Sequence, residues 1–439
     1  MSTRPRTLLF ACCLLLTSSL LLALTQARLG SRLFFVFATG LCISQLLGVI
    51  AIRRREPPRR WLWIAVGVAV ACRLPLMVGP VNYDSDMIRY VYDGRVQRFG
   101  YNPYAVVPSD PALAHTHTVD TARMPSRNAR TPYPPAAQLF FRLMVTIKES
   151  ARLMKSVLAL LDIATIFIVL RWLRATGRSE WLFLGYAWNP LVILEIAHSG
   201  HIDGLGVFWI ALSAYWMARR RTALAVIACT LAVATKLLPI VLAPLFIGRV
   251  KVRDIAIGAG ALLALYLPFM AGAVPVGAVP NVVEYIRFNG PVFRSLAWAV
   301  TPTGAAAFAL VAGLGAAFWA RRTLDMDDPA GWAWPMAVTL ACAPVIYPWY
   351  LLYFTPFLLT VATVPLTAWT LTVISSYIVW QLAHDHAAPW VMPVSVLGWE
   401  YAIPLMVGAL VVGRSHIAAI VNRHRSRPHR IETREEERT

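Results

Sequence analysis

The sequence has few charged residues. Only 14% of its 439 residues are Asp, Glu, Lys or Arg, whereas 58% are hydrophobic. A soluble protein carries about a quarter charged residues, so this composition excludes an ordinary soluble domain and indicates a polytopic membrane protein. Acidic residues are the scarcer kind, with 22 Asp and Glu against 41 Lys and Arg. The basic residues fall in short clusters between apolar runs, as expected for loops that fix membrane orientation, which argues against a nucleic-acid partner.

Cysteines are also few, and all lie in apolar stretches. They are Cys12, Cys13, Cys42, Cys72, Cys229 and Cys342. None falls in a candidate outer loop, so the sequence predicts neither a disulfide nor a metal framework. The chain has no Walker phosphate loop, no G-x-G-x-x-G after a strand and no serine nucleophile elbow. An enzyme that lacks such a nucleotide-binding domain needs another activated donor, and a lipid-linked donor fits a membrane protein.

Apolar runs near the length of a membrane span, about 20 residues, recur along the chain. They cover residues 7–26, 33–52, 61–80, 151–170, 181–197, 204–218, 222–236, 237–248, 255–272, 295–319, 331–346, 349–364, 366–382 and 392–412. The runs predict an all-α polytopic membrane protein with about 12–14 transmembrane helices. The first 30 residues imitate a signal peptide, but the next run follows at once, which favours an uncleaved first helix. Residues 222–248 are read as two short spans around Lys236 to Pro239, with one kinked helix as the alternative.

The basic clusters predict the orientation of these spans. They are Arg4 and Arg6, residues 53–60, Arg171 with Arg174 and Arg178, residues 219–221, Arg249 with Lys251 and Arg253, Arg321 with Arg322, and the tail from Arg414. With two short spans in 222–248, all fall on one side, which the positive-inside rule assigns to the cytoplasm. Residues 1–413 then form one transmembrane domain with both termini cytoplasmic, a long outer loop at 81–150 and a disordered basic tail at 414–439.

The long outer loop opens with two carboxylates directly after an apolar span. Asp84 and Asp86 lie where a membrane helix meets water, a costly place for an acid. We interpret them as a general base and its partner, and ordinary solvated loop acids are the alternative. Ile88, Val91 and Tyr92 recur at helical spacing. The start of the loop therefore predicts an interfacial amphipathic helix.

Other polar residues belong to the same outer side. The turn 198–203 contains His201 and Asp203, which we interpret as a phosphate- or sugar-binding pair. A metal-binding fragment and an N-cap role for Asp203 are the alternatives. Lys236 lies at the break in 222–248 and predicts anion binding, with snorkelling to the interface as the alternative. Tyr133 could line a sugar pocket, although the prolines around it also suit a helix start.

Three further features belong to loops or spans. Arg294, in the outer loop 273–294, is another candidate for substrate binding. Asp162 lies inside an apolar run, and we expect it to be structural and paired, as buried acids in membrane helices are. Residues 347–350, Y-P-W-Y, fit an interfacial aromatic belt, with stacking on a sugar as the alternative.

Several of these motifs resemble those of glycosyltransferase family 87 and related polyprenol-phosphate-mannose-dependent mannosyltransferases, which belong to the C-type superfamily of membrane glycosyltransferases. They are D-M-I-R-Y-V-Y-D-G-R-V at 86–96, G-Y-N-P-Y at 100–104, Y-P-P-A-A-Q at 133–138, G-H-I-D-G-L at 200–205, K-L-L-P at 236–239 and Y-P-W-Y-L-L at 347–352. The resemblance covers about residues 60–365.

The resemblance implies a C-type glycosyltransferase fold and transfer of a sugar, often mannose, from a polyprenyl-phosphate carrier to a glycan or lipid acceptor. It also implies an extracytoplasmic site, with a catalytic aspartate early in the first large outer loop. The high Arg and Ala content is compatible with a bacterial source, so we expect the protein in a bacterial plasma membrane. Family members often carry two adjacent acids before R-Y, and here Ser85 stands at the first of those places. Asp86 is therefore the candidate base, with Asp84 as its candidate partner. The superfamily has metal-dependent and metal-independent members, so a divalent metal stays open as a cofactor.

In the resulting hypothesis, Asp86 removes the proton of the acceptor hydroxyl. Lys236, His201 and Arg89 neutralise the departing lipid phosphate. A secondary transporter is one rival, but transporters tend to have paired broken helices, and the sequence has one broken segment. A non-catalytic membrane scaffold for envelope assembly is the other rival, and it should tolerate the loss of Asp86.

Overall fold

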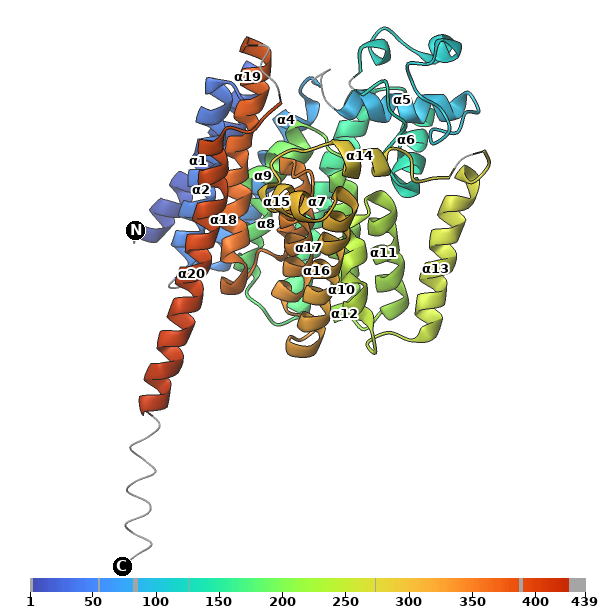
Figure 1. The fold of residues 1–439 in the computed structure, drawn as a ribbon. Helices are drawn as coiled ribbons and strands as arrows, with labels where there is room; N and C mark the ends of the chain where they lie inside the picture. Colours follow the sequence, from blue (N-terminus) through green and yellow to red (C-terminus); the bar gives the residue numbers. More distant parts are fainter. Residues whose placement is uncertain are drawn as a thin grey trace, which may run out of the picture.

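The structure is a computed structural model, and it describes residues 3–53, 56–81, 86–124, 126–272, 274–386 and 390–425. Its regular structure is helical (Figure 1). The described residues contain no β-strand, and an isolated parallel bridge joins Phe288 to Val345. The predicted all-α fold is confirmed.

Among the described residues, eight helical stretches are long and apolar enough to cross a membrane. They are formed by α1 (Thr3–Thr25), α2 (Arg32–Ile52), α3 (Arg59–Ala71) with α4 (Leu74–Val78), α7 (Ala151–Ala175), α13 (Val252–Tyr266) with η6 (Leu267–Phe269), α16 (Pro302–Thr323), the series η8 (Val361–Thr363), α18 (Val364–Thr372), η9 (Val373–Tyr377) and α19 (Ile378–His386), and α20 (Val394–Arg425). Each coincides with one of the apolar runs, so the protein is a polytopic membrane protein. Helix α20 continues to Arg425, into the expected tail, and residues 426–439 lie outside the described part.

The other six apolar runs form shorter or broken helices. They contain η3 (Glu180–Phe183), α8 (Leu184–Ala187), α9 (Pro190–Val192), the π-helical turn η4 (Ile193–His198), α10 (Asp203–Ala218), α11 (Thr222–Thr235), η5 (Leu238–Leu242), α12 (Ala243–Phe246), α17 (Pro329–Ala341) and the 3-10 helix η7 (Pro348–Phe357). Prolines open α9 and η7 and lie at the second position of η5 and α12. Proline lacks a backbone N–H and ends a preceding α-helix, which explains why these segments are short.

The loops that we expect to lie outside form short helices at one end of the bundle, and we call these helices the outer layer. It contains α5 (Asp86–Arg98), η1 (Pro111–Thr116), η2 (Thr121–Arg123), α6 (Pro135–Ile147), α14 (Val279–Tyr285) and α15 (Pro291–Ala299). In Figure 1, α5 and α6 lie at the upper end of the long helices, with α14 beside α6. This layer covers the end of the bundle at which the candidate site residues lie.

Side-chain caps fix the starts of several long helices. Ser31, Ser150 and Thr301 accept hydrogen bonds from the first turns of α2, α7 and α16. A capping oxygen satisfies one of the free N–H groups of a helix start, a role for which Ser and Thr are preferred. The chain therefore enters these spans at defined residues.

Asp162 lies in a buried ion pair between two spans. Arg73, at the junction of α3 and α4, places its Nε 2.6 Å from Asp162 Oδ2, and both side chains are fully buried. The hydroxyl of Tyr186 donates to Asp162 Oδ1 at 2.7 Å, and Arg73 also donates to the Ala187 carbonyl at 2.9 Å. The expected pairing of Asp162 is confirmed, and its partner is Arg73.

The basic clusters meet at the end of the bundle opposite the outer layer. Arg249 donates to the Arg321 carbonyl at 3.2 Å, Arg178 donates to the Asp327 carbonyl at 3.4 Å, and Arg59 lies 3.8 Å from Glu180. Glu180 also pairs with Arg174 near the end of α7. Lys155, near the start of α7, is 19 residues away, and a helix rises 1.5 Å per residue, so the two ends are roughly 28 Å apart. This is about the thickness of the bilayer's hydrocarbon core.

Candidate active site

Asp86 is the first residue of α5, a helix enclosed by the protein. Ten residues of α5 from Met87 to Gln97 are buried, and α6 and η2 pack against it. Gly94 lets the two helices meet closely, because a Cβ there would lie 2.4 Å from the Phe141 carbonyl oxygen. The predicted helix is therefore confirmed, but its amphipathic character is wrong, since η1, η2 and α6 cover its faces. Asp86 itself is half-buried.

Two tyrosines face this carboxylate from α5 and from the loop before α6. The rings of Tyr90 and Tyr133 meet edge to face, with centroids 5.0 Å apart, and Tyr90 also stacks on Phe141. Burial raises the pKa of both phenols well above the ordinary value, and the charge of Asp86 raises them further. Both hydroxyls therefore stay protonated near Asp86 and can donate hydrogen bonds. Tyr133 thus lies beside Asp86, as a pocket-lining residue would.

The turn that carries His201 has an unusual backbone. It follows the π-helical turn η4, and such turns are rare and occur frequently at functional sites. Gly200 has φ +78°, a conformation that residues with a Cβ seldom adopt. A Cβ at Gly200 would also lie 2.5 Å from Met87 Cε and 3.0 Å from Lys155 Cγ. The glycine therefore lets the turn pack directly on α5 and α7.

His201 forms an ion pair with an acid that the sequence analysis did not select. Its Nδ1 lies 2.7 Å from Glu195 Oε2, and Glu195 is fully buried in η4. The imidazole ring also stacks on the Trp349 ring, with centroids 4.1 Å apart and planes 11° apart. Burial alone would lower the pKa of His201. The charge of Glu195 and, to a smaller extent, those of Asp86 and Asp203 raise that pKa above the ordinary value. The surroundings of His201 therefore favour its imidazolium form, and Asp86 is one of the acids that do so.

Lys236 and Asp203 form the second ion pair of the cluster. Helix α11 ends at Thr235, and Lys236 is the extended residue that follows it, so the predicted break is confirmed. Its Nζ lies 2.7 Å from Asp203 Oδ1 and 3.8 Å from the centroid of the Tyr350 ring. Asp203 is the first residue of α10, whose N-cap is Ile202, so the N-cap alternative for Asp203 is wrong. Asp203 Oδ2 accepts no hydrogen bond from the described residues.

The Y-P-W-Y motif closes the cluster from the other side. Tyr347 stacks on Trp349 with centroids 4.6 Å apart and planes 10° apart, and Trp349 stacks in turn on His201. Burial and the Asp86 charge raise the pKa of Tyr347 to about 12. Trp349 is buried, so the motif packs inside the protein rather than forming an aromatic belt in contact with lipid headgroups.

The structure does not bring every candidate residue into this cluster. Arg89 is buried beside Asp93, with Nε 2.8 Å from Asp93 Oδ1, and it donates to the Ser126 carbonyl. Arg294 is exposed on α15 and contacts none of the cluster side chains among the described residues. Asp84 lies outside the described residues. Asp86, Tyr133, His201, Asp203 and Lys236 are therefore the candidates that converge.

Sequence reasoning missed three polar residues near this cluster. Glu195 sits in the apolar string L-V-I-L-E-I-A, where a single acid was the available signal. Lys155 is buried and donates to the carbonyls of Pro80 and His198, at 3.0 and 3.3 Å. The Tyr90 hydroxyl accepts a hydrogen bond from the backbone N–H of Ile202 at 3.4 Å, which ties α5 to the His201 turn.

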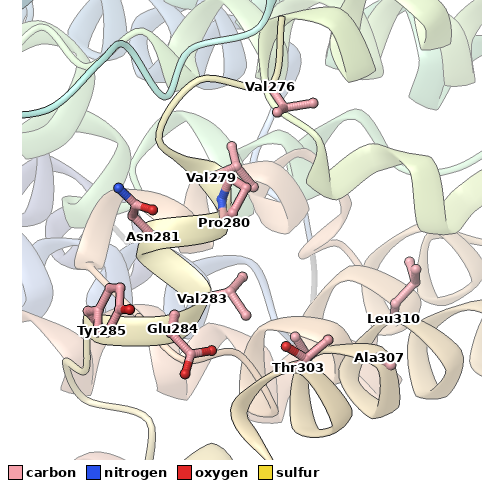
Figure 2. Close-up of a pocket in the computed structure, with 11 residues that line it drawn as sticks. Val276, Val279, Pro280, Asn281, Val283, Glu284, Tyr285, Thr303, Ala307 and Leu310 are labelled. Atoms are coloured by element: carbon pink, nitrogen blue, oxygen red, sulfur yellow. The ribbon is translucent and has the colours of Figure 1, made fainter. Parts of the chain in front are cut away.

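An open apolar cavity of about 680 Å³ lies beside the outer layer. Figure 2 shows the residues of α14 and α16 that line it, among them Val283 on α14 and Ala307 and Leu310 on α16. The chain after α14 leads to Phe288, whose backbone bridges to Val345 and whose ring packs on Tyr347 with centroids 4.7 Å apart. Residues 286–288 thus link the helix α14, which lines the cavity, to the aromatic wall of the cluster, formed by Tyr347 and Trp349.

The same residues include the metal-binding fragment that the sequence left as an alternative. In the part of the chain that the structure describes, no group of three or more His, Cys, Asp or Glu side chains is arranged to hold a metal ion. His201 and Asp203 face Glu195 and Lys236 instead of each other. In the described residues, the two side chains of the H-x-D fragment are thus engaged in ion pairs with protein groups.

Chemically, the cluster combines a carboxylate with two neutralised cations. No described cation pairs with Asp86, whereas His201 and Lys236 each have an acid partner. A free carboxylate can accept a proton, and paired cations can stabilise a developing negative charge. Such an arrangement suits transfer of a group between a phosphate and a hydroxyl.

The comparison with protein families agrees with this chemistry. Residues 6–253, more than half of the chain, match the model of a family described as alpha-(1->6)-mannopyranosyltransferase, N-terminal domain. A comparison with curated proteins gives no match. The matched range contains Asp86, Tyr133, Glu195, His201 and Lys236, whereas the Y-P-W-Y motif lies beyond it. The chain therefore belongs to this mannosyltransferase family, and its apolar helices make it a membrane mannosyltransferase.

Proposed function

We propose that the protein transfers mannose from a polyprenyl-phosphate carrier to a hydroxyl of a glycan or lipid acceptor, and that Asp86 is the general base. The observation that carries the proposal is the convergence of an unpaired Asp86 with the His201–Glu195 and Lys236–Asp203 ion pairs. The family description, alpha-(1->6), further suggests that the acceptor hydroxyl is the 6-hydroxyl of a sugar. The motifs resembling glycosyltransferase family 87 support the lipid-linked donor.

The proposed reaction is an inverting displacement at the anomeric carbon. Asp86 takes the proton of the acceptor hydroxyl while that oxygen forms the new glycosidic bond. The bond between the anomeric carbon and the phosphate oxygen breaks, and its electron pair leaves with the lipid phosphate. Lys236 and His201 stabilise that negative charge, because cations favour an anionic leaving group. Tyr133 lines the sugar pocket, and Arg89 has no part, since Asp93 holds its guanidinium.

We assign the site to the extracytoplasmic face of a bacterial plasma membrane. The arginine-bearing loops meet at the opposite end of the bundle, and an excess of Lys and Arg marks cytoplasmic loops. Both termini are then cytoplasmic, and residues 1–413 act as one catalytic domain. A lipid phosphate at the outer headgroup level would lie near the end of α7 at which Lys155 is found.

The polyprenyl chain of the donor is assigned to the cavity between α14 and α16. Its lining is mainly apolar, and α16 is one of the eight helices that can span a membrane. A chain in this cavity would run from the bilayer towards the Tyr347–Trp349 wall. Each methylene group of the polyprenyl chain that is buried against this lining would contribute about 0.8 kcal/mol to binding. The affinity for the donor would therefore increase with the length of the chain in the cavity.

Transfer by the purified protein tests this proposal. The chain is placed in lipid nanodiscs with labelled polyprenyl-phosphate mannose and a mannoside acceptor, and the product is identified by its linkage. Asp86→Asn should lower turnover by about 10²–10⁴-fold, the contribution typical of a positioned base. Asp110→Asn is the matched control, because Asp110 caps η1 in the same loop and should leave turnover unchanged.

Three outcomes would contradict parts of the proposal. Wild-type turnover in Asp86→Asn would remove the base assignment, whereas no transfer by the wild-type protein from any mannose donor would favour the scaffold. Transfer from a nucleotide-linked mannose, with none from the lipid-linked donor, would remove the carrier. Uptake into sealed vesicles without transfer would favour the secondary transporter.

A further inference from the structure

Glu195 is a buried acid for which the reaction has no direct use. Its side chain is fully buried in the π-helical turn η4, and the cation near it is His201. Among the described residues, no other donor hydrogen-bonds either of its carboxylate oxygens. Removing an acid from water without several hydrogen bonds is costly. The group that can offset this cost is His201, whose Nδ1 lies 2.7 Å from Glu195 Oε2.

The contacts of His201 fix the direction of its ring. The Nδ1 edge faces Glu195, with Oε2 at 2.7 Å and the backbone carbonyl at 3.3 Å. One face of the ring lies against Trp349, which is itself held by stacking on Tyr347. No described residue hydrogen-bonds the remaining nitrogen, Nε2. A protonated imidazole held in this way has one N–H donor left for a ligand.

We propose that Glu195 is a positioning residue that keeps His201 in its imidazolium form, with the Nε2–H directed at the phosphate of the lipid-linked donor. This inference rests on the proposed function, and it names the part of the donor that His201 recognises. The acid does not touch the substrate in this arrangement. It acts through the histidine, in the way that a buried aspartate orients a catalytic histidine in other enzymes.

The charges around His201 agree with this role. Glu195 faces it from η4, Asp86 from α5 and Asp203 from α10, and all three favour the imidazolium. Burial opposes them. His198 lies on the same turn, and its pKa is lowered to about 4 by burial and by the charges of Lys155 and His201, so it adds no positive charge at neutral pH. The acid in direct contact with His201 is Glu195.

The pH dependence follows from the sign of this effect. A raised pKa keeps the imidazolium present to higher pH, so donor binding should persist below the folded-state pKa and fall as the pH rises through it. Removing the Glu195 charge lowers the pKa of His201. The alkaline limit of activity should then move to lower pH, by about 1–3 units, the range caused by a nearby opposite charge.

Glu195→Gln is the test, because it removes the charge and keeps the shape. At pH values above the shifted limit, the donor KM should rise by about tenfold for each unit of pKa lost. At low pH the histidine is protonated without Glu195, so the wild-type KM should return. This rescue by acid would not occur if Glu195 only held the fold together. Glu149→Gln is the matched control, since Glu149 pairs with Arg95 in the outer loop and should leave the pH profile unchanged.

His201→Gln completes the design. Adding Glu195→Gln to His201→Gln should produce no further change in KM, because the acid acts through the histidine. Magnetic resonance of isotope-labelled histidine in nanodiscs should also show the His201 pKa falling in Glu195→Gln, with His201→Gln assigning its signal among the nine histidines. This measurement needs no transfer activity, so it separates a failure of this inference from a failure of the proposed function.

The inference is overturned by either of two results. One is a Glu195→Gln protein that folds, as judged by its thermal unfolding, and keeps the wild-type pH limit and His201 pKa. The other is a loss of turnover that is equal at all pH values and is not rescued by acid.

Discussion

The ammonium group of Lys236 lies 2.7 Å from Asp203 Oδ1, in a pair that joins the break after α11 to the first turn of α10. Asp203 is almost completely buried, whereas the Lys236 side chain is about one-fifth exposed. The lysine can therefore reach a ligand from a position in which it already neutralises a buried acid. An arriving phosphate would compete with Asp203 for the same cation.

The single variant Lys236→Met and the double variant with Asp203→Asn should differ in stability but not in donor affinity. Lys236→Met leaves a buried carboxylate unpaired, which should lower the free energy of unfolding by about 3–5 kcal/mol. Adding Asp203→Asn removes that charge and should restore most of the stability. Donor affinity should stay low in the double variant, because the cation is still missing. Thermal unfolding and the donor KM measure the two effects.

Recovery of both stability and donor affinity in the double variant would show that Lys236 only balances Asp203. Lys236→Arg is the conservative control. It keeps the charge and should retain part of the donor affinity, although a guanidinium does not match the geometry of a lysine over the Tyr350 ring.

The buried Arg73–Asp162 pair should behave as a purely structural pair. Arg73→Met leaves Asp162 without its cation, and we expect a loss of about 3–5 kcal/mol in the free energy of unfolding. The double variant Arg73→Met with Asp162→Leu should regain stability, since replacing both members by apolar residues is often neutral. Its turnover per folded molecule should equal that of the wild type. A stable double variant with a large loss of kcat would instead link this pair to catalysis.

The long helices and one side of the site could be predicted from the sequence. Hydropathy predicted the eight long stretches, because a membrane span must be apolar along its length and must form its backbone hydrogen bonds within the helix. The break at Lys236 was predicted because Pro239 cannot continue a helix. The convergence of Asp86 and His201 followed from counting spans, which placed both loops at the same end.

The rest depends on packing between distant segments. Glu195 lies six residues before His201, and its proximity to that ring arises from the π-helical turn and from Gly200 at φ +78°. The sequence could not show that Arg89 lies outside the site, because the direction of its side chain is set by the contact with Asp93 one turn later. The burial of α5 was missed because its cover, η1 and η2, comes from a polar loop without strong periodicity.

Filling the cavity between α14 and α16 should affect long-chain donors selectively. Ala307→Trp places a large ring in the space that we assign to the polyprenyl chain. Displacing two buried methylene groups costs about 1.6 kcal/mol, a factor of about 15 in affinity. The KM should rise by about this factor for a long-chain donor and stay unchanged for a short-chain analogue. Val311→Trp, on the same helix and outside the lining, is the control.

An equal change in KM for both chain lengths would contradict the assignment of the cavity. So would an equal effect of Val311→Trp, since that residue is exposed on α16 and lines no part of the cavity.

The two ends of the bundle should be accessible from opposite sides of the membrane. Val119, in the outer loop between η1 and η2, and Val252, at the start of α13, are both strongly exposed, at 73% and 82%. In a variant whose six cysteines are replaced, a membrane-impermeant maleimide should label Val119→Cys in intact cells. It should label Val252→Cys only after the cells are permeabilised, because Val252 adjoins the cluster of Arg249, Lys251 and Arg253 that we assign to the cytoplasm. Labelling of both residues in intact cells would contradict the predicted alternation of spans. Labelling of Val252→Cys alone would place Asp86 on the cytoplasmic side, where the proposed extracytoplasmic transfer could not occur.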